Sequence, residues 1–85
     1  MPSSAQVSVN TTATVLVAAT AFDQSVYLHN SGGGIVYLGG ADVTTANGYK
    51  LDNGDKLSLM VGDHEALYAV TASGTNVVAV LKQIN

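Results

Sequence analysis

Short stretches in which apolar residues alternate with polar ones run along most of this 85-residue chain. Residues 56–61 (KLSLMV) are the clearest case, because Leu57, Leu59 and Val61 fall on one face of an extended segment. Side chains alternate between the two faces of a β-strand, so this pattern predicts a strand with one face turned toward a core. Residues 76–84 show the same alternation and are predicted to form the last strand.

A near repeat marks the middle of the chain. The tripeptide VYL occurs at residues 26–28 and again at residues 36–38, on either side of the glycine-rich residues 31–34 (SGGG). Because glycines supply the positive φ values that a tight reversal needs, this arrangement predicts a β-hairpin. In that hairpin Tyr27 lies opposite Tyr37 on the outer face, and the aliphatic residues beside them face the core.

Turn signals divide the rest of the chain at intervals of about ten residues, as in an antiparallel sandwich or barrel. Further short strands are expected near residues 7–9, 14–18, 49–51 and 66–70. We therefore predict an all-β fold, a small antiparallel β-sandwich or barrel of about seven to eight short strands. Its predicted core consists of Val26, Leu28, Val36, Leu38, Leu57, Leu59 and Leu67, with Phe22 as a plug from the connection before the repeat.

The size of the chain allows a single core. We expect residues 7–85 to form one β domain and the small, polar residues 1–6 to form a flexible N-terminal arm. A chain this short lies near the lower limit of independent stability, and the absence of cysteine excludes disulfides as a remedy.

Composition favours self-association, rather than disulfides, as the source of additional stability. Only 11% of the residues are charged and 47% are apolar, so uncharged small residues must cover much of the surface. Charged residues are depleted from the centres of protein interfaces, which suits a subunit of an assembly. A monomeric β domain with a neutral polar surface is the other interpretation of the same composition.

Charge and length exclude two classes of partner. The net charge is −3 and the chain has no arginine, so it cannot form the basic surface that binds several phosphates of a nucleic acid. The apolar residues 13–21 are too few to span a bilayer, and we expect no membrane association.

Candidate chemistry is sparse. Residues 63–65 (DHE) bring together possible metal ligands, but neighbouring side chains near a turn point in different directions. Residues 52–55 (DNGD) lack the spacing of a calcium-binding EF-hand loop, and the glycines of residues 31–34 lead to no helix that could hold a phosphate. His29 is interpreted as an ordinary polar residue at a strand end, and the serines have no nucleophile setting. We expect no enzyme activity, no catalytic or metal-binding residue and no cofactor.

Several segments together resemble the small all-β decoration proteins, also called head-cementing proteins, of tailed bacteriophage capsids. The resemblance extends from about residue 7 to residue 81. It is carried by VYLGG at residues 36–40, Val43-Thr44, Asn47-Gly48, Leu51, Gly54, ALYAVTASGT at residues 66–75 and VVAVL at residues 77–81.

The resemblance implies a non-enzymatic role on the outer surface of the virion. Many copies made in the host cytoplasm would bind the major capsid protein of the assembled head and stabilise the shell against the pressure of packaged DNA. Members of this kind are often trimers and use an N-terminal arm to pair with the capsid, which here would add a strand to a sheet edge. Many weak contacts then suffice, because multivalent binding raises the effective affinity.

The residues expected to contact a partner are the two tyrosines and the start of the chain: Tyr27, Tyr37, Gln6, Val7 and Val9. Exposed aromatic side chains are efficient contact residues, although tyrosines also simply cover a sheet or lie beneath a loop. A tail, vertex or fibre component would use the same fold at lower copy number. A carbohydrate-binding module is a further alternative, which the absence of tryptophan makes less favourable.

Overall fold

Eight strands follow one another along residues 2–84, the part of the chain that the computed structural model describes, and none of these residues is helical. In chain order they are β1 (Pro2–Val9), β2 (Thr14–Val17), β3 (Gln24–Asn30), β4 (Val36–Gly39), β5 (Tyr49–Leu51), β6 (Lys56–Val61), β7 (Leu67–Thr71) and β8 (Asn76–Ile84). The predicted bounds of the last strand are confirmed.

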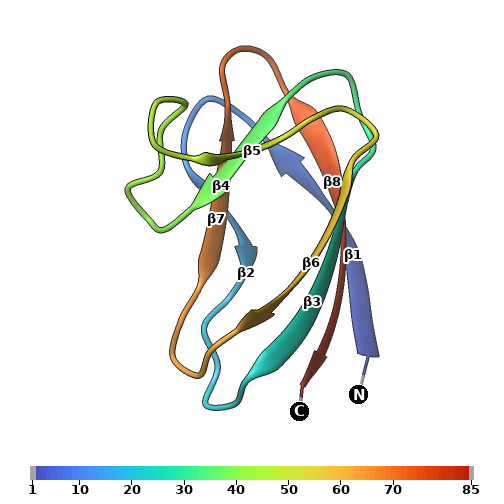
Figure 1. Cartoon of the computed structure of the whole chain (residues 1–85), viewed down its shortest axis with the longest axis vertical. Coiled ribbons are helices and arrows are strands. Elements are labelled where there is room, and N and C mark those ends of the chain that lie inside the picture. The colour runs from blue at the N-terminus through green and yellow to red at the C-terminus, as the bar shows by residue number, and fades with distance from the viewer. Residues whose placement is uncertain (1, 85) are drawn as a thin grey trace.

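The strands form two four-stranded antiparallel sheets that pack face to face (Figure 1). Sheet A has the order β1-β8-β3-β6, and sheet B has the order β2-β7-β4-β5. Each sheet therefore has two edge strands, β1 and β6 in sheet A and β2 and β5 in sheet B. The prediction of a small antiparallel all-β fold is confirmed, and its form is the sandwich.

The core lies between the sheets and is built mainly from valine and leucine. Val26 and Leu28 of β3 and Val36 and Leu38 of β4 are buried, as the alternating pattern predicted. The other predicted core residues, Leu57, Leu59 and Leu67, are partly buried and pack against this cluster. Burial at every second residue holds β3 and β4 in one register, since a shift by one residue would expose their apolar side chains.

The predicted hairpin is wrong. β3 pairs with β6 and β8 in sheet A, whereas β4 pairs with β5 and β7 in sheet B, so residues 31–35 cross from one sheet to the other. Alternation specifies which face of a strand is buried but not which strand lies beside it. Both copies of VYL bury their valine and leucine side chains. These side chains are buried just as well when the two strands lie in opposite sheets and face each other across the core as when they pair in one hairpin.

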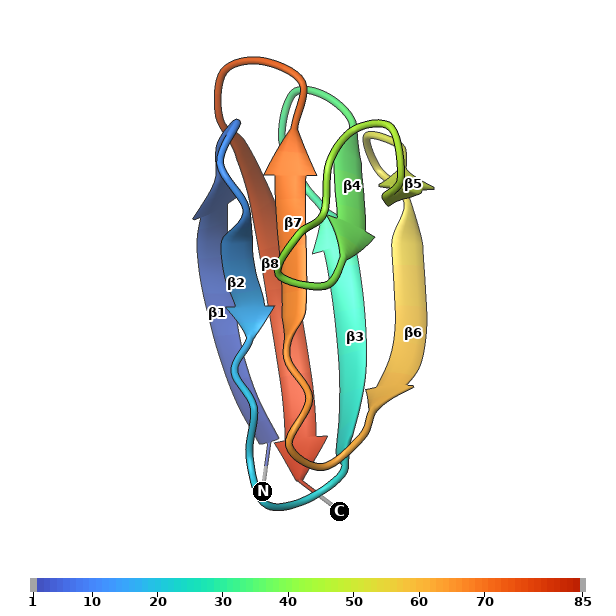
Figure 2. The ribbon, with the colours of Figure 1, turned by 90° about the vertical axis from the view of Figure 1, so that its left-hand side faces the viewer.

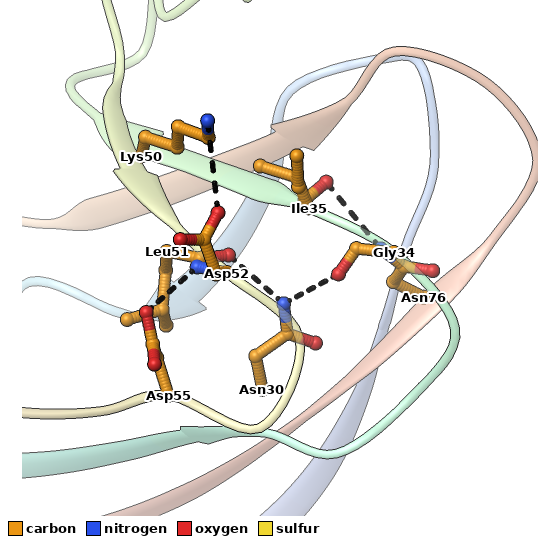
Figure 3. Close-up of polar contacts among 8 residues, drawn as sticks. All are labelled: Asn30, Gly34, Ile35, Lys50, Leu51, Asp52, Asp55 and Asn76. Carbon is orange, nitrogen blue, oxygen red and sulfur yellow. Dashed lines mark hydrogen bonds and ion pairs between the residues drawn. The ribbon is translucent and has the colours of Figure 1, made fainter.

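A buried asparagine fixes this crossing (Figure 3). The Asn30 side chain is fully buried, and its Nδ2 donates to the carbonyl oxygens of Gly34 at 2.7 Å and Leu51 at 3.0 Å. From β8, Asn76 Nδ2 donates to Ile35 O at 3.4 Å. Two side-chain amides thus bond the carbonyl groups of Gly34 and Ile35, which belong to no strand of either sheet.

Phe22 does not plug the core, because its side chain is 57% exposed. Its backbone nitrogen donates to Thr20 Oγ1 at 3.2 Å, and the Thr20 hydroxyl donates to Phe22 O at 2.8 Å, which closes a tight local turn. The interior position nearby belongs to Gln24, which is fully buried and whose Nε2 donates to Ala18 O at 3.1 Å.

Residues 2–6, expected to belong to a flexible N-terminal arm, lie in strand β1. β1 pairs with β8 along its whole length, from Pro2 opposite Gln83 to Val9 opposite Asn76. Pairing of this kind uses backbone groups, so small polar side chains such as those of residues 3–6 are compatible with it. Met1, the first residue of the expected arm, and Asn85 lie outside the described residues.

Candidate interaction surface

The two tyrosines expected to form one contact patch lie on opposite faces of the molecule. Tyr27 sits between the buried residues Val26 and Leu28 of sheet A, so its side chain points outward, where it is 51% exposed. Tyr37 sits between Val36 and Leu38 of sheet B and points outward from that sheet. The crossing between the sheets, which replaces the hairpin, separates the two side chains.

Residues 40–48 fold over the outer face of sheet B (Figure 2). Tyr37 of β4 contacts this loop at Gly48. A Cβ atom added at Gly48 would stand 2.6 Å from the Tyr37 Cβ, so the loop backbone touches the tyrosine directly. Val43, a residue of this loop, is itself buried. This tyrosine is therefore half-buried and serves to seat the loop.

Sheet A presents an open outer face. Along β8 the outward residues are Ala79 and Leu81, and the registers place them beside His29 and Tyr27 of β3. A shallow groove of about 890 Å³ runs across these strands from Gln6 in β1 to Lys56 in β6. We call this the sheet A groove and define it by Gln6, Tyr27, His29, Lys56, Ala79 and Leu81.

Exposed apolar side chains gather at this groove. Leu81 is 44% exposed within it, and Met60 of β6 is 61% exposed on the same outer face. Lys56 provides the groove with one ammonium group, at the first residue of β6. The surface is thus largely apolar with a polar rim, a composition typical of surfaces that contact another protein.

The three contact residues expected near the start of the chain, Gln6, Val7 and Val9, differ in how deeply they are buried. Gln6 is exposed and lines the sheet A groove. Val7 is half-buried and packs against the core, and Val9 is completely buried within it. The side chain of Val9 therefore offers no surface to a partner.

The four sheet edges are protected to different degrees. β2 has four residues and a register irregularity between Val15 and Val17, and β5 has three residues with an ion pair between Lys50 and Asp52 at 3.7 Å. β6 has six residues and begins with a lysine. β1 has eight residues, and its sequence PSSAQVSV carries no charge. Short length, bulges and lysines are the usual devices that block edge pairing, and apart from its first residue, a proline, β1 lacks them.

The sequence held a signal for this edge that the patterns of alternation did not reveal. The first charged residue of the chain is Asp23, so the whole of β1 is neutral. All six acidic residues, moreover, fall outside the strands. A neutral edge strand lacks the charges that commonly block pairing with another chain.

The candidate chemical groups remain dispersed. Among residues 2–84, no three of the histidine, aspartate and glutamate side chains are arranged to hold a metal ion. Asp63 Oδ2 lies 3.2 Å from His64 Nδ1, but both side chains are exposed and His64 has a φ of 62°, as in a tight turn. Residues 2–84 include no helix with the length and hydrophobicity needed to cross a membrane.

No protein-family model and no curated protein matches this sequence. Among solved structures, one from work on Bacillus endospore appendages, described as "a novel family of disulfide-linked pili", is similar in fold. The TM-score is 0.66 with 15% sequence identity, and the match covers 99% of this chain and 85% of that one. The likeness shows a shared sandwich fold. This chain has no cysteine, so it has no counterpart to the disulfides in that description.

Proposed function

We propose that this chain is a non-enzymatic structural subunit of a larger assembly, and that its role is in a fibre, tail or appendage. The fold it shares with a subunit of a pilus supports this assignment, since the match covers almost the entire chain. The low content of charged residues supports it as well.

The observation that carries the proposal is the neutral, eight-residue edge strand β1 beside the sheet A groove. An unprotected edge offers unpaired backbone groups to another chain, and backbone pairing gives affinity without a deep pocket. The exposed side chains of Tyr27, Met60 and Leu81 add apolar contact area on the same sheet. Edge and face together form a surface that suits protein contacts better than catalysis.

Capsid decoration is a second candidate, favoured by the resemblance of residues 36–40 and 66–75 to decoration proteins. In that role the partner would be the major capsid protein, and a trimer on the outer surface of the virion would present the sheet A groove to the shell. Both candidates are structural. They differ in copy number and in the place that the chain occupies on a particle.

Quantitative mass spectrometry of purified particles, combined with immunogold electron microscopy, distinguishes the two. A fibre or tail component is expected at low copy number relative to the major capsid protein, with gold confined to a filament, tail or vertex. A ratio near one or one third, with gold over the whole shell, would support decoration instead. Absence of the chain from every particle and filament would contradict the structural role.

A further inference from the structure

We propose that copies of this chain join side by side, with β6 of one copy pairing antiparallel to β1 of the next, so that sheet A continues from subunit to subunit. This inference rests on the proposed structural function and names its partner as a second copy of the chain. The pairing joins two different surfaces, and such head-to-tail contacts extend into open filaments unless a rotation closes them into rings.

Strand direction favours this pairing. Neighbouring strands of sheet A are antiparallel throughout, and the sheet has four strands, so the two edge strands β1 and β6 run in opposite directions. A second copy set beside the first in the same orientation therefore places its β1 antiparallel to β6. The junction then has the same geometry as every other pair in the sheet, and a third copy is added in the same way.

The backbone groups at the two edges also match. Asn30 N donates to Asp55 O, and Ser31 N donates to Val77 O, which continue the β3–β6 and β3–β8 registers. Bonded and non-bonded pairs alternate in an antiparallel ladder, so even residues of β3 bond to β6 and odd ones to β8. The same alternation continues from β8 to β1. The backbone N–H and C=O groups that point outward from the two edges of sheet A therefore belong to Ser4, Gln6 and Ser8 in β1, and to Lys56, Ser58 and Met60 in β6.

One register pairs all six residues of β6 and keeps the outer faces together. It sets Ser58 opposite Gln6 of the next copy, which makes both residues members of a bonded pair. On the inner face it sets Leu57 opposite Val7 and Leu59 opposite Ala5 of the next copy. Leu57, Leu59 and Val7 are only partly buried in the single chain. The proposed junction covers them.

The opposing layer explains why these side chains are uncovered. β5, the edge strand of sheet B on the β6 side, has three residues against six in β6, and β2 has four against eight in β1. Each edge strand of sheet A is therefore longer than the edge strand of sheet B on the same side of the sandwich. Charge does not oppose the contact, since Lys56 is the only charged residue of the two edge strands.

Cysteine trapping tests the pairing in a chain that has no cysteine of its own. In the double variant Gln6→Cys with Ser58→Cys, the two positions of adjacent copies would have Cα atoms about 5.5 Å apart, within the range of a disulfide. Within one copy they are separated by three strand spacings, about 14 Å, which prevents an internal bond. Both native side chains are exposed, so the fold should tolerate the changes.

Under mild oxidation the double variant is expected to give a ladder of dimers, trimers and longer products on a non-reducing gel, lost on reduction. Each single variant alone is expected to remain monomeric, and an equal mixture of the two should stop at the dimer. The matched control is Ser58→Cys with Thr75→Cys, in which the second cysteine lies on the exposed turn before β8, four residues along the chain from Ala79, the residue that pairs with Gln6, and should give no ladder.

Three outcomes would overturn the pairing, and they separate it from the proposed function. Dimers from Gln6→Cys alone would indicate a two-fold contact between two β1 strands. An oligomer in sedimentation that gives no cross-link would show that the copies associate elsewhere, which leaves the structural role in place. A chain that stays monomeric at every concentration and is absent from particles would contradict both proposals.

Discussion

Asn30 connects three segments of the chain through one fully buried amide. Its Nδ2 donates to Gly34 O in the crossing between the sheets and to Leu51 O at the end of β5, so it links β3, the crossing and β5 at one end of the sandwich. A backbone carbonyl group that is buried without a hydrogen-bond donor destabilises the fold, because it has lost its hydrogen bonds to water and formed none in the protein. This side chain therefore determines where the chain leaves sheet A.

The variant Asn30→Ala removes the donor from both carbonyls and is expected to lower the free energy of unfolding by about 2–3 kcal/mol. Urea denaturation followed by circular dichroism measures the change. The control is Asn53→Ala, an exposed residue of a neighbouring turn, which should stay within about 0.5 kcal/mol of the parent. Equal stability of the two variants would show that the Asn30 bonds contribute little.

Gln24 presents the opposite case. Its Nε2 donates to Ala18 O, but the buried Oε1 has no hydrogen-bond partner among the described residues. Replacement by Met keeps much of the volume and removes the unpaired oxygen, which offsets the loss of one bond. We expect Gln24→Met to change the free energy of unfolding by less than about 1 kcal/mol, whereas a loss as large as that of Asn30→Ala would contradict this explanation.

At the scale of elements, the loop of residues 40–48 is held to sheet B by close contact with Tyr37. The variant Gly48→Ala would place a methyl group against the Tyr37 Cβ and 3.0 Å from Thr44 O. Overpacking of this kind costs about 1–3 kcal/mol, so the melting temperature should fall. The matched control is Gly40→Ala in the same loop, where the nearest atom is 3.5 Å away and little change is expected. Equal melting temperatures for both variants would contradict the contact.

Which strands form was predictable from the sequence, and which strands pair was not. Leu28 and Val36 were predicted inside because apolar residues alternate around them, and both are buried. Their predicted partnership failed because the Asn30 amide and the fit of Gly32 against Val77 N, 3.3 Å from a Cβ added there, direct the crossing. Such contacts join residues distant in sequence, so a local pattern does not contain them.

The same limit applies to the candidate surface. Tyr27 was predicted to face outward from its strand pattern and does so. That Gln6 belongs to the same groove depends on β8 lying between β1 and β3, an order that only the folded sheet specifies. The neutrality of β1 was visible in the sequence, but its meaning depends on its place at an edge.

Charge at the β1 edge tests the assembly proposed for this element. In the proposed register Gln6 lies diagonally across from Lys56 of the neighbouring copy, at a separation of about 7–8 Å. Gln6→Lys is expected to weaken association, because a second ammonium group would stand beside the first. Gln6→Glu at the same position should weaken it much less. Sedimentation velocity at matched concentrations compares them, and equal effects of both variants would exclude a role for Lys56.

Considered as a whole, the molecule divides its surface between one closed sheet and one open sheet. A loop covers part of the outer face of sheet B (Figure 2). Sheet A keeps an exposed apolar face and a neutral edge. Its acidic residues lie in the connections between strands, and of the six only Asp55, next to Lys56, directly adjoins an edge strand of sheet A. This distribution allows lateral growth through sheet A and keeps the charges in solvent.

Assembly through such surfaces should depend little on salt. Between about 0.1 M and about 1 M salt the screening length falls from about 10 Å to about 3 Å, which would dissociate an assembly held by ion pairs. Backbone pairing and apolar contact are not screened in this way, and the edge strands of sheet A carry a single charge. We therefore expect the sedimentation profile to be unchanged across this range, or shifted slightly toward larger species. The second result would arise because three positive and six negative charges leave each chain with a net charge of −3, and salt weakens the repulsion between chains of like charge. Dissociation at high salt would instead assign the contact to the lysines and the acidic turns, and would contradict pairing through β1 and β6.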